Sequence, residues 1–387
     1  MAELSRLKRY INKLPDNELA DIFGLYISRM HETKKIINEN NGVLWFDKNI
    51  VGLNNDGLAR LEELEKQQKN NSGRHVNERQ LRYLRALKMM SMKVPDSFRD
   101  EINPKKLFVE LRDFCIDNNI PEEILNRLVP SVITYIETGH IRPVILVGEK
   151  GCGKTTALRM LLEKALKMPS EVVKIPQLDG GHGMTGDCDT FQSADAGVIA
   201  KARLNNNTLL VAYIFDEIDK VPHFTNRSNI DDELLSITDE SNNSIYDNFL
   251  ETTIVGLEYC PMFFTANDLN KINPILADRC SIITFPSASA TRIKKICQGF
   301  VMNKIDSRLF KDVDFDYDLM FKTIDKMVEG NVASIRKHQQ MIEAVLDKAL
   351  NELFTGNNNC RIKTSEKMFK EAMTAVMGTE KRKIGFN

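Results

Sequence analysis

The first part of the chain carries apolar residues at helical spacing. One stretch holds Leu19, Ile22, Phe23, Leu25, Tyr26 and Ile27, which follow the period of an α-helix. The polar, turn-rich residues 67–73 predict a loop, and a helical pattern resumes near Glu78. Because no alternating strand pattern occurs in this part, we predict a helical N-terminal domain over residues 1–110.

The middle of the chain alternates between two patterns. Residues 121–139 begin with Pro121, Glu122 and Glu123, a proline and two acids that favour the first turn of a helix. From 144 to about 286, short apolar runs alternate with helical segments, which indicates strand–helix units around a mostly parallel sheet. The expected strands are 144–147, 171–175, 208–215, 261–265 and 281–285.

Beyond Pro286 the strand pattern stops. Segments 291–304, 317–328 and 332–354 have helical patterns, which favour a helical lid. The expected fold class is therefore α/β, with three parts. These parts are the helical N-terminal domain at 1–110, an α/β core at 111–286, and the helical lid with a C-terminal tail at 287–387.

The loop after the first expected strand carries the clearest chemistry. Residues 148–155 read Gly-Glu-Lys-Gly-Cys-Gly-Lys-Thr, and they lie between a strand and a helix, as in a phosphate-binding loop. Glycines there let backbone N–H groups surround phosphates at a helix N-terminus. Lys154 is expected at the β- and γ-phosphates and the Thr155 hydroxyl at Mg²⁺. The residues expected to bind the nucleotide are Gly148, Glu149, Lys150, Gly151, Cys152, Gly153, Lys154, Thr155 and Thr156.

Two acids follow the third expected strand. Asp216 and Glu217 come directly after the apolar run 209–215. Asp216 is expected to hold Mg²⁺ through its water shell, and Glu217 to polarise the attacking water, since phosphoryl transfer depends on positioning and charge stabilisation. A solvated strand end is the alternative explanation. The phosphate-binding loop upstream favours the catalytic one, and together the two motifs predict binding of ATP with Mg²⁺.

Composition narrows the class of protein. The chain has 42% hydrophobic and 28% charged residues and a net charge of -1, so we expect a soluble protein rather than a wholly basic nucleic-acid binder. Seven cysteines without a C-x-x-C pair argue against a disulfide framework or a zinc site. The six histidines lack paired metal spacing. With no signal-peptide or membrane-span pattern, the expected location is the cytoplasm.

Several segments in order resemble one family. The phosphate-binding loop and Phe-Asp-Glu-Ile-Asp-Lys at 215–220 are similar to those of AAA+ ATPases, and within them to the Lon branch. Residues 180–194, residues 232–250, Phe-Thr-Ala-Asn at 264–267 and Leu-Ala-Asp-Arg at 276–279 resemble Lon segments in the same order. The resemblance covers roughly residues 120–350. It implies the AAA+ type of P-loop core with a helical lid.

The resemblance also implies roles for single residues. Asn267 occupies the place of the sensor that contacts the γ-phosphate or the attacking water, and Arg336 that of the lid arginine that senses nucleotide state. Arg279 resembles the arginine finger supplied to a neighbouring subunit, and Phe191 an aromatic pore residue that grips polypeptide. Three of these have a plainer alternative: a turn asparagine at 267, a surface salt bridge between Arg279 and Asp278, and a core phenylalanine at 191.

The chain also departs from Lon. Lon proteins continue into a peptidase domain, whereas this sequence stops at Asn387, so self-contained proteolysis is not expected. Glu149 and Lys150 stand where many AAA+ members have prolines. Basic residues gather in one predicted helical region and could follow a phosphate backbone, although nearby acids dilute them. They are Arg74, Arg79, Arg82, Arg85, Lys88 and Lys93.

The sequence thus predicts a Lon-like AAA+ ATPase that hydrolyses Mg-ATP to remodel or unfold a protein substrate. It is expected to feed a separate effector such as a peptidase or nuclease. A finger that acts on a neighbour implies a ring, and the resemblance implies a hexamer. Two alternatives stay open: a DNA-associated AAA+ ATPase of a mobile element, phage or defence system, and an ATP-dependent assembly scaffold.

Overall fold

The protein is built on a five-stranded parallel sheet. The computed structural model describes residues 49–70, 76–90, 92–93, 104–166, 168–178, 182–188, 193–221, 229–240, 243–305, 310–355 and 361–381. The strand order is β4-β5-β8-β3-β9, and every neighbouring pair is parallel. The strands are β3 (Val144–Val147), β4 (Ser170–Lys174), β5 (Ala212–Asp216), β8 (Met262–Ala266) and β9 (Ser281–Thr284). The expected fold class, a mostly parallel sheet flanked by helices, is confirmed.

The central strands are apolar because helices cover both faces of the sheet. Every residue of β8 is buried, and the rings of Phe215 and Phe264 stack across β5 and β8 with their centroids 5.2 Å apart. One expected strand was too long. Residues 208–211 were assigned to β5, but pairing with β4 begins only at Ala212. Leu209 and Val211 are nevertheless fully buried, so their apolar character reflects the core rather than the sheet.

Helices and short elements surround this sheet. α5 (Pro104–Asp117) packs on α6 (Glu122–Thr138), and the expected domain boundary near residue 110 falls inside α5. The other helices of the core are α7 (Lys154–Arg159), α8 (His182–Thr185), α9 (Val198–Asn206), α10 (Ile230–Ile237) and α11 (Pro274–Arg279). A π-helical turn (Met160–Ala165) continues α7, and the antiparallel strands β6 (Ile245–Asp247) and β7 (Thr252–Ile254) form a hairpin. Short 3₁₀ turns lie at Ile175–Gln177, Ile218–Lys220, Leu257–Tyr259 and Leu269–Lys271.

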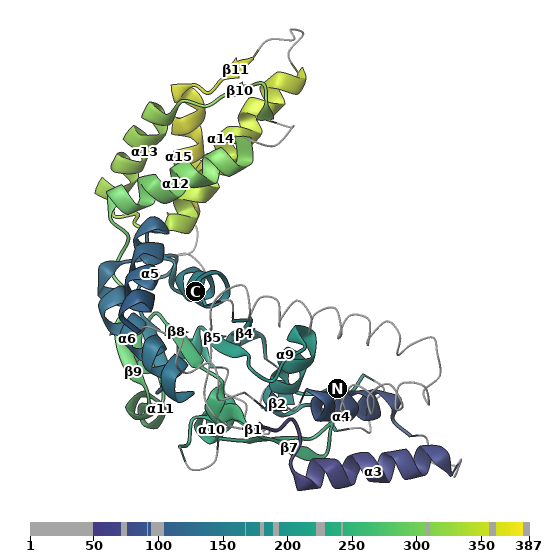
Figure 1. The fold of residues 1–387 in the computed structure, drawn as a ribbon. Helices are drawn as coiled ribbons and strands as arrows, with labels where there is room; N and C mark the ends of the chain where they lie inside the picture. Colours follow the sequence, from purple (N-terminus) through teal and green to yellow (C-terminus); the bar gives the residue numbers. More distant parts are fainter. Residues whose placement is uncertain are drawn as a thin grey trace.

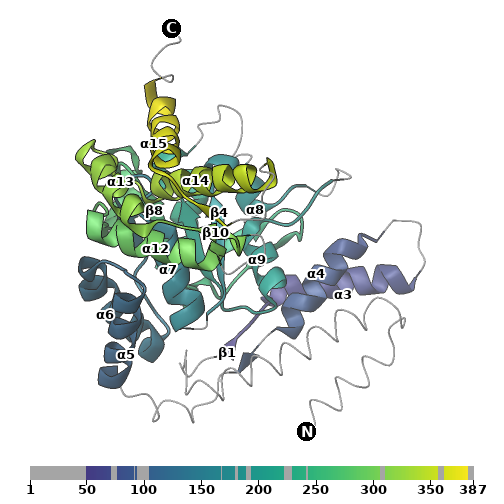
Figure 2. The same ribbon diagram turned by 90° about the horizontal axis from the view of Figure 1, so that it is seen from above.

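The described N-terminal elements lie at one end of the molecule (Figures 1 and 2). α3 (Asn55–Lys69) and α4 (Glu78–Met89) pack together, as the helical pattern predicted, but α3 extends to Lys69, into the stretch where a loop was expected. A short antiparallel pair, β1 (Asn49–Ile50) with β2 (Met92–Lys93), was not expected. The apolar residues of these helices join the same core as the sheet. Residues 1–48, including the pattern at 19–27, lie outside the described residues.

A group of helices stands at the other end of the molecule (Figure 1). α12 (Ala290–Ile305), α13 (Tyr317–Glu329) and α14 (Ile335–Thr355) match the expected lid helices closely. The sequence did not predict α15 (Glu366–Lys381) or the parallel pair β10 (Val313–Asp314) and β11 (Ile362–Lys363). These elements enclose an apolar core of their own, separate from that of the sheet. Among the described residues, no helix combines the length and apolar character that crossing a membrane requires.

Candidate functional site

The loop between β3 and α7 has a conformation that requires its glycines. Gly151 and Gly153 have φ angles of 78° and 100°, in the left-handed region that glycine adopts without strain. A Cβ at Gly151 would lie 2.3 Å from Oγ of Ser334, and one at Gly148 would lie 2.4 Å from the carbonyl oxygen of Phe285. The glycines therefore permit both the turn and the close approach of neighbouring segments.

Lys154 begins α7 and folds back over the loop. Its ammonium donates to the carbonyl oxygens of Gly148 (2.7 Å) and Glu149 (3.0 Å) and to Oδ1 of Asn267 (3.2 Å). Burial lowers the pKa of Lys154, and the charges of Cys152 and Asp216 partly oppose that shift. A buried cation bound to these three neutral oxygens is well placed to take phosphate oxygens as further partners.

The carboxylate of Asp216, at the end of β5, accepts hydrogen bonds from two hydroxyl groups. Thr155 donates to Oδ1 from 2.7 Å, and Thr265 donates to the same oxygen. Hydroxyl and carboxylate oxygens are the ligands that Mg²⁺ prefers, and Mg²⁺ commonly uses one or two protein ligands together with water and phosphate oxygens. The contact between Thr155 and Asp216 therefore fits the expected magnesium site.

Glu217 follows Asp216 in an unusual backbone conformation. Its φ angle is 62°, and its N–H donates to Oγ1 of Thr265 over 3.2 Å. Its carboxylate forms an ion pair with Nζ of Lys220 at 2.7 Å, and its side chain is about one-third exposed. A glutamate in left-handed backbone is strained, and such strain is found where a side chain must point in one direction.

These residues line one cavity, of about 140 Å³, at the carboxyl end of the sheet. Its walls are Lys150, Gly151, Gly153, Lys154, Thr155, Thr156, Asp216, Glu217, Thr265, Asn267, Ile335, Arg336 and Gln339. The lid supplies Arg336, and the N–H of Ile335 donates to the carbonyl oxygen of Gly151 over 3.0 Å. β3, β5 and β8 are neighbours in the sheet, so the residues that follow them meet at one edge.

Sequence reasoning missed three residues of this cavity, Thr265, Ile335 and Gln339. Thr265 belongs to the segment 264–267 that resembles Lon, two residues before Asn267. This position in the sequence could have indicated Thr265. The side chain of Asn267 makes two hydrogen bonds: its Oδ1 accepts from Lys154, and its Nδ2 donates to Asp219 over 3.4 Å. Of the expected loop residues, Gly148, Glu149 and Cys152 do not line the cavity. The buried side chain of Cys152 belongs to the core instead.

Arg279 lies at the opposite end of the sheet from this cavity. It ends α11, two positions before the first residue of β9, whereas the loop and the acids of the cavity follow β3 and β5. Its guanidinium donates to the carbonyl oxygen of Leu235 and pairs with Asp239 at 3.2 Å. The alternative salt bridge with Asp278 is therefore wrong, because adjacent residues on a helix point in different directions. Arg142 donates to the backbone carbonyls of Asp278 and Arg279 and fixes the end of α11.

The basic residues of α4 are partly engaged within the protein. Arg79 donates to the carbonyl oxygen of Ala194 over 3.0 Å, and Arg85 pairs with Glu65 at 3.1 Å. These contacts dock α4 on the core and reduce the charge it offers to nucleic acid. Phe191, expected in a pore loop, lies outside the described residues.

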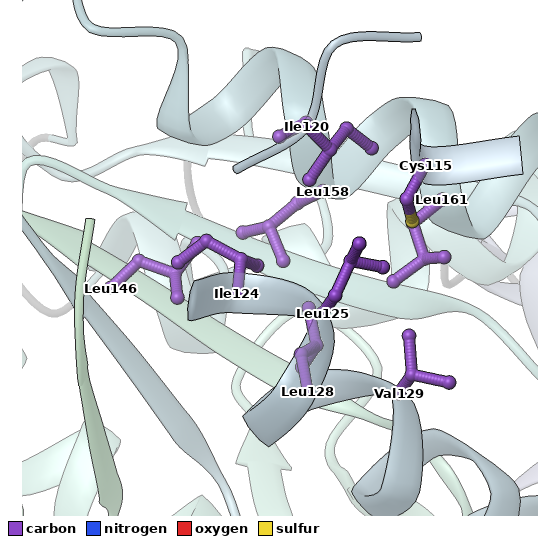
Figure 3. A pocket seen from close by; sticks show the side chains of 10 residues that line it. Cys115, Ile120, Ile124, Leu125, Leu128, Val129, Leu146, Leu158 and Leu161 are labelled. Carbon is purple, nitrogen blue, oxygen red and sulfur yellow. The ribbon is translucent and has the colours of Figure 1, made fainter. Parts of the chain in front are cut away.

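A second hollow, between α5, α6 and α7, is apolar and lined by buried residues (Figure 3). Its volume is about 10 Å³, and Figure 3 shows side chains such as Ile120, Leu125 and Leu158 converging on it. Among the described residues that line it, only Cys115 carries a group capable of hydrogen bonding, a thiol. It is a small gap in the core rather than a ligand site.

Comparison with known proteins finds one family profile and several relatives that are similar to parts of this chain. A family profile described as ORC-CDC6-like matches residues 113–177. The chain is 24% identical over 363 residues to a Lon protease homolog of Acanthamoeba polyphaga mimivirus, covering 89% of this chain and 33% of that protein. It is 26% identical to the Lon protease of Flavobacterium johnsoniae, over 59% of this chain and 28% of that protein. The Lon protease of Methanosphaera stadtmanae is 29% identical over 48% of this chain and 22% of its own length.

The chain thus spans about a third or less of the length of these curated relatives. Among solved structures, a mutant of RuvB from Thermotoga maritima aligns with a TM-score of 0.42 and 14% identity, over 67% of this chain and 71% of that one. The Lon similarities confirm the resemblance to a Lon-like AAA+ ATPase module that the motifs indicated.

Proposed function

We propose that this chain binds Mg-ATP in the cavity at the carboxyl end of the sheet and hydrolyses it to ADP and phosphate. The observation that carries the proposal is the meeting of Lys154, Thr155, Asp216, Glu217 and Asn267 around one cavity. Three neighbouring strands deliver them, so the arrangement depends on the fold and not on one local motif. A cation, two magnesium-type ligands, a carboxylate and an amide are the groups that phosphoryl transfer to water requires.

Each residue has a part in the proposed reaction. Lys154 exchanges its contact with the carbonyl oxygens of Gly148 and Glu149 for the phosphate oxygens. Thr155 and Asp216 would hold Mg²⁺, which neutralises charge on the phosphates when bound. Glu217 accepts a hydrogen bond from the attacking water after its carboxylate turns away from Lys220, and the amide of Asn267 orients the water or the γ-phosphate.

Arg279 would act on the nucleotide of a neighbouring copy. Its position at the amino end of the sheet excludes contact with the cavity of its own chain, whereas its guanidinium is about one-third exposed. A guanidinium supplied in trans stabilises charge on the transferred phosphoryl group. We therefore propose that copies of this chain assemble into a ring, of six subunits in the arrangement that the Lon resemblance implies.

The work proposed for this ring is remodelling or unfolding of a protein. The named relatives are Lon proteases, and the chain corresponds to a limited part of them. In this proposal the unfolded product passes to an effector. The DNA-associated alternative is less well supported, because Arg79 and Arg85 already bind groups of the protein itself. The scaffold alternative predicts slow turnover despite these residues.

Steady-state ATPase measurements test the proposal. The wild type is compared with Glu217→Gln, which keeps the size of the side chain but cannot accept a proton, and with Glu329→Gln, an exposed lid glutamate, as the matched control. We expect Glu217→Gln to bind ATP and to lose turnover, while Glu329→Gln keeps both. Adding an unfolded protein or duplex DNA to separate samples shows which polymer stimulates the wild type. Absence of turnover in the wild type under every condition would leave the scaffold alternative.

A further inference from the structure

Arg292 joins the lid to the core beside the phosphate-binding loop. It lies in the first turn of α12, and its Nε donates to the carbonyl oxygen of Asn119, in the turn between α5 and α6, over 2.8 Å. Its guanidinium carbon lies 5.2 Å from the centre of the Phe285 ring, at the end of β9. Two contacts from the core therefore fix the plane and the direction of this side chain.

One nitrogen of this fixed guanidinium lacks a partner. Nη1 of Arg292 is buried and has no hydrogen-bond acceptor among the residues that the structure describes. Among the described residues, no carboxylate forms an ion pair with Arg292. The charge of Glu123 acts on Arg292 from a longer distance. A buried donor left unsatisfied costs free energy, and the cost is higher for a charged group. An acceptor supplied by a bound ligand would remove this cost.

The guanidinium of Arg292 lies beside the loop, and Nη2 is its nitrogen nearest to Gly153. The position that a Cβ would take at Gly153 is 3.5 Å from Nη2 of Arg292 and 3.6 Å from Cδ1 of Ile335. Gly153 and Ile335 line the phosphate cavity, but Arg292 does not, whereas the other lid arginine, Arg336, does. Arg292 therefore lies just beyond the phosphates, on the side where Ile335 offers apolar surface.

We propose that Arg292 binds the nucleoside part of the nucleotide. A ribose or base that leaves the phosphate cavity past Gly153 meets an apolar side chain and a planar cation with an open N–H donor. Ring nitrogens and ribose oxygens are acceptors for such donors, and a guanidinium also stacks on an aromatic ring. This role makes Arg292 a specificity residue of the lid. It rests on the proposed function, because it requires a nucleotide at Lys154.

Binding measurements with two ligands test this role. Arg292→Gln is compared with the wild type for binding of ATP and of inorganic triphosphate, each with Mg²⁺, and Lys295→Gln on the exposed side of α12 is the matched control. We expect Arg292→Gln to raise the dissociation constant for ATP by roughly tenfold or more, as for loss of a charged hydrogen bond. Its affinity for triphosphate should stay within about twofold of the wild type, and Lys295→Gln should change neither.

Other outcomes separate the competing explanations. Equal weakening of ATP and triphosphate would assign Arg292 to the phosphates and overturn the nucleoside role. If Arg292→Gln binds both ligands with unchanged affinity but has a lower melting temperature without ligand, Arg292 only joins the lid to the core and the nucleoside role is wrong. Failure of the wild type to bind either ligand would refute the proposed function itself.

Discussion

The hydroxyl group of Thr265 donates a hydrogen bond to the carboxylate of Asp216. The oxygen of this hydroxyl also accepts the N–H of Glu217 over 3.2 Å, so one side chain on β8 fixes both acids at the end of β5. Thr265 is buried, so its hydroxyl cannot turn to solvent instead. The position of the acidic pair therefore depends on a neighbouring strand as well as on its own.

Removing the hydroxyl of Thr265 tests whether the position of Asp216 and Glu217 depends on it. Thr265→Val has nearly the same shape, but it leaves the N–H of Glu217 without its acceptor. We expect the free energy of unfolding to fall by about 1–3 kcal/mol and kcat for ATP to fall by about tenfold. Thr265→Ser keeps the hydroxyl and is the control. Urea unfolding and ATPase assays measure both effects, and a Thr265→Val protein with wild-type kcat would contradict this role.

The left-handed backbone of Glu217 predicts a difference between two inactive variants. Its φ angle is 62°, which glycine adopts freely and alanine does not. Glu217→Gly and Glu217→Ala both remove the carboxylate and the ion pair with Lys220. We expect Glu217→Gly to be more stable than Glu217→Ala by about 1 kcal/mol, as measured by denaturant unfolding. Equal stability would mean that the backbone relaxes when the carboxylate is absent.

Arg279 and Glu217 belong to opposite ends of the same sheet, which makes a mixing experiment decisive. Arg279→Ala is expected to lower kcat by about 10³ if the guanidinium acts on a neighbour. Each Arg279→Ala subunit keeps a complete cavity, and each Glu217→Gln subunit keeps an intact Arg279. Mixed rings would therefore contain some complete sites, and we expect the mixture to recover part of the ATPase activity that each variant alone has lost.

In the control mixture, both kinds of subunit carry Arg279→Ala. A mixture of Arg279→Ala with the double variant Arg279→Ala/Glu217→Gln has no source of the guanidinium and should stay inactive. If the first mixture also stays inactive although the subunits exchange, Arg279 does not act in trans. Its contacts with Leu235 and Asp239 would then be structural.

The sequence predicted the parts of the site that are contiguous in the chain. The glycines, Lys154 and Thr155 form one motif whose backbone conformation their own residue types determine. The acids at 216 and 217 end a buried run, and the parallel sheet that the pattern predicted brings them to the same edge. Local pattern and fold class were sufficient for these residues.

Contacts across the fold could not be predicted in this way. Thr265 reaches Asp216 only because β5 and β8 are neighbours, and strand order is not visible in the hydrophobic pattern. Arg279 pairs with Asp239, which is distant in sequence, rather than with the adjacent Asp278. Arg292 was not predicted either. Its position depends on contacts with Asn119 and Phe285, which belong to two other segments of the chain.

A buried carboxylate away from the cavity predicts a dependence of stability on pH. Asp247 ends β6, where its two oxygens accept the N–H groups of Gly197 (2.8 Å) and Leu250 (2.9 Å). Burial raises its pKa to about 6, and the backbone hydrogen bonds only partly oppose that shift. The folded protein therefore holds this proton more tightly than the unfolded chain does, between about pH 4 and 6.

The sign of the effect follows from this difference in proton binding. Where the folded state binds more protons, stability falls as pH rises, so the contribution of Asp247 is largest near pH 4 and is lost through about pH 6. The loss amounts to about 3 kcal/mol for this shift in pKa. We expect the free energy of unfolding of the wild type, minus that of Asp247→Asn, to decrease by up to this amount between about pH 4 and 7. Asp312→Asn removes an exposed carboxylate and controls for net charge. A difference that stays constant with pH would show that Asp247 titrates alike in both states.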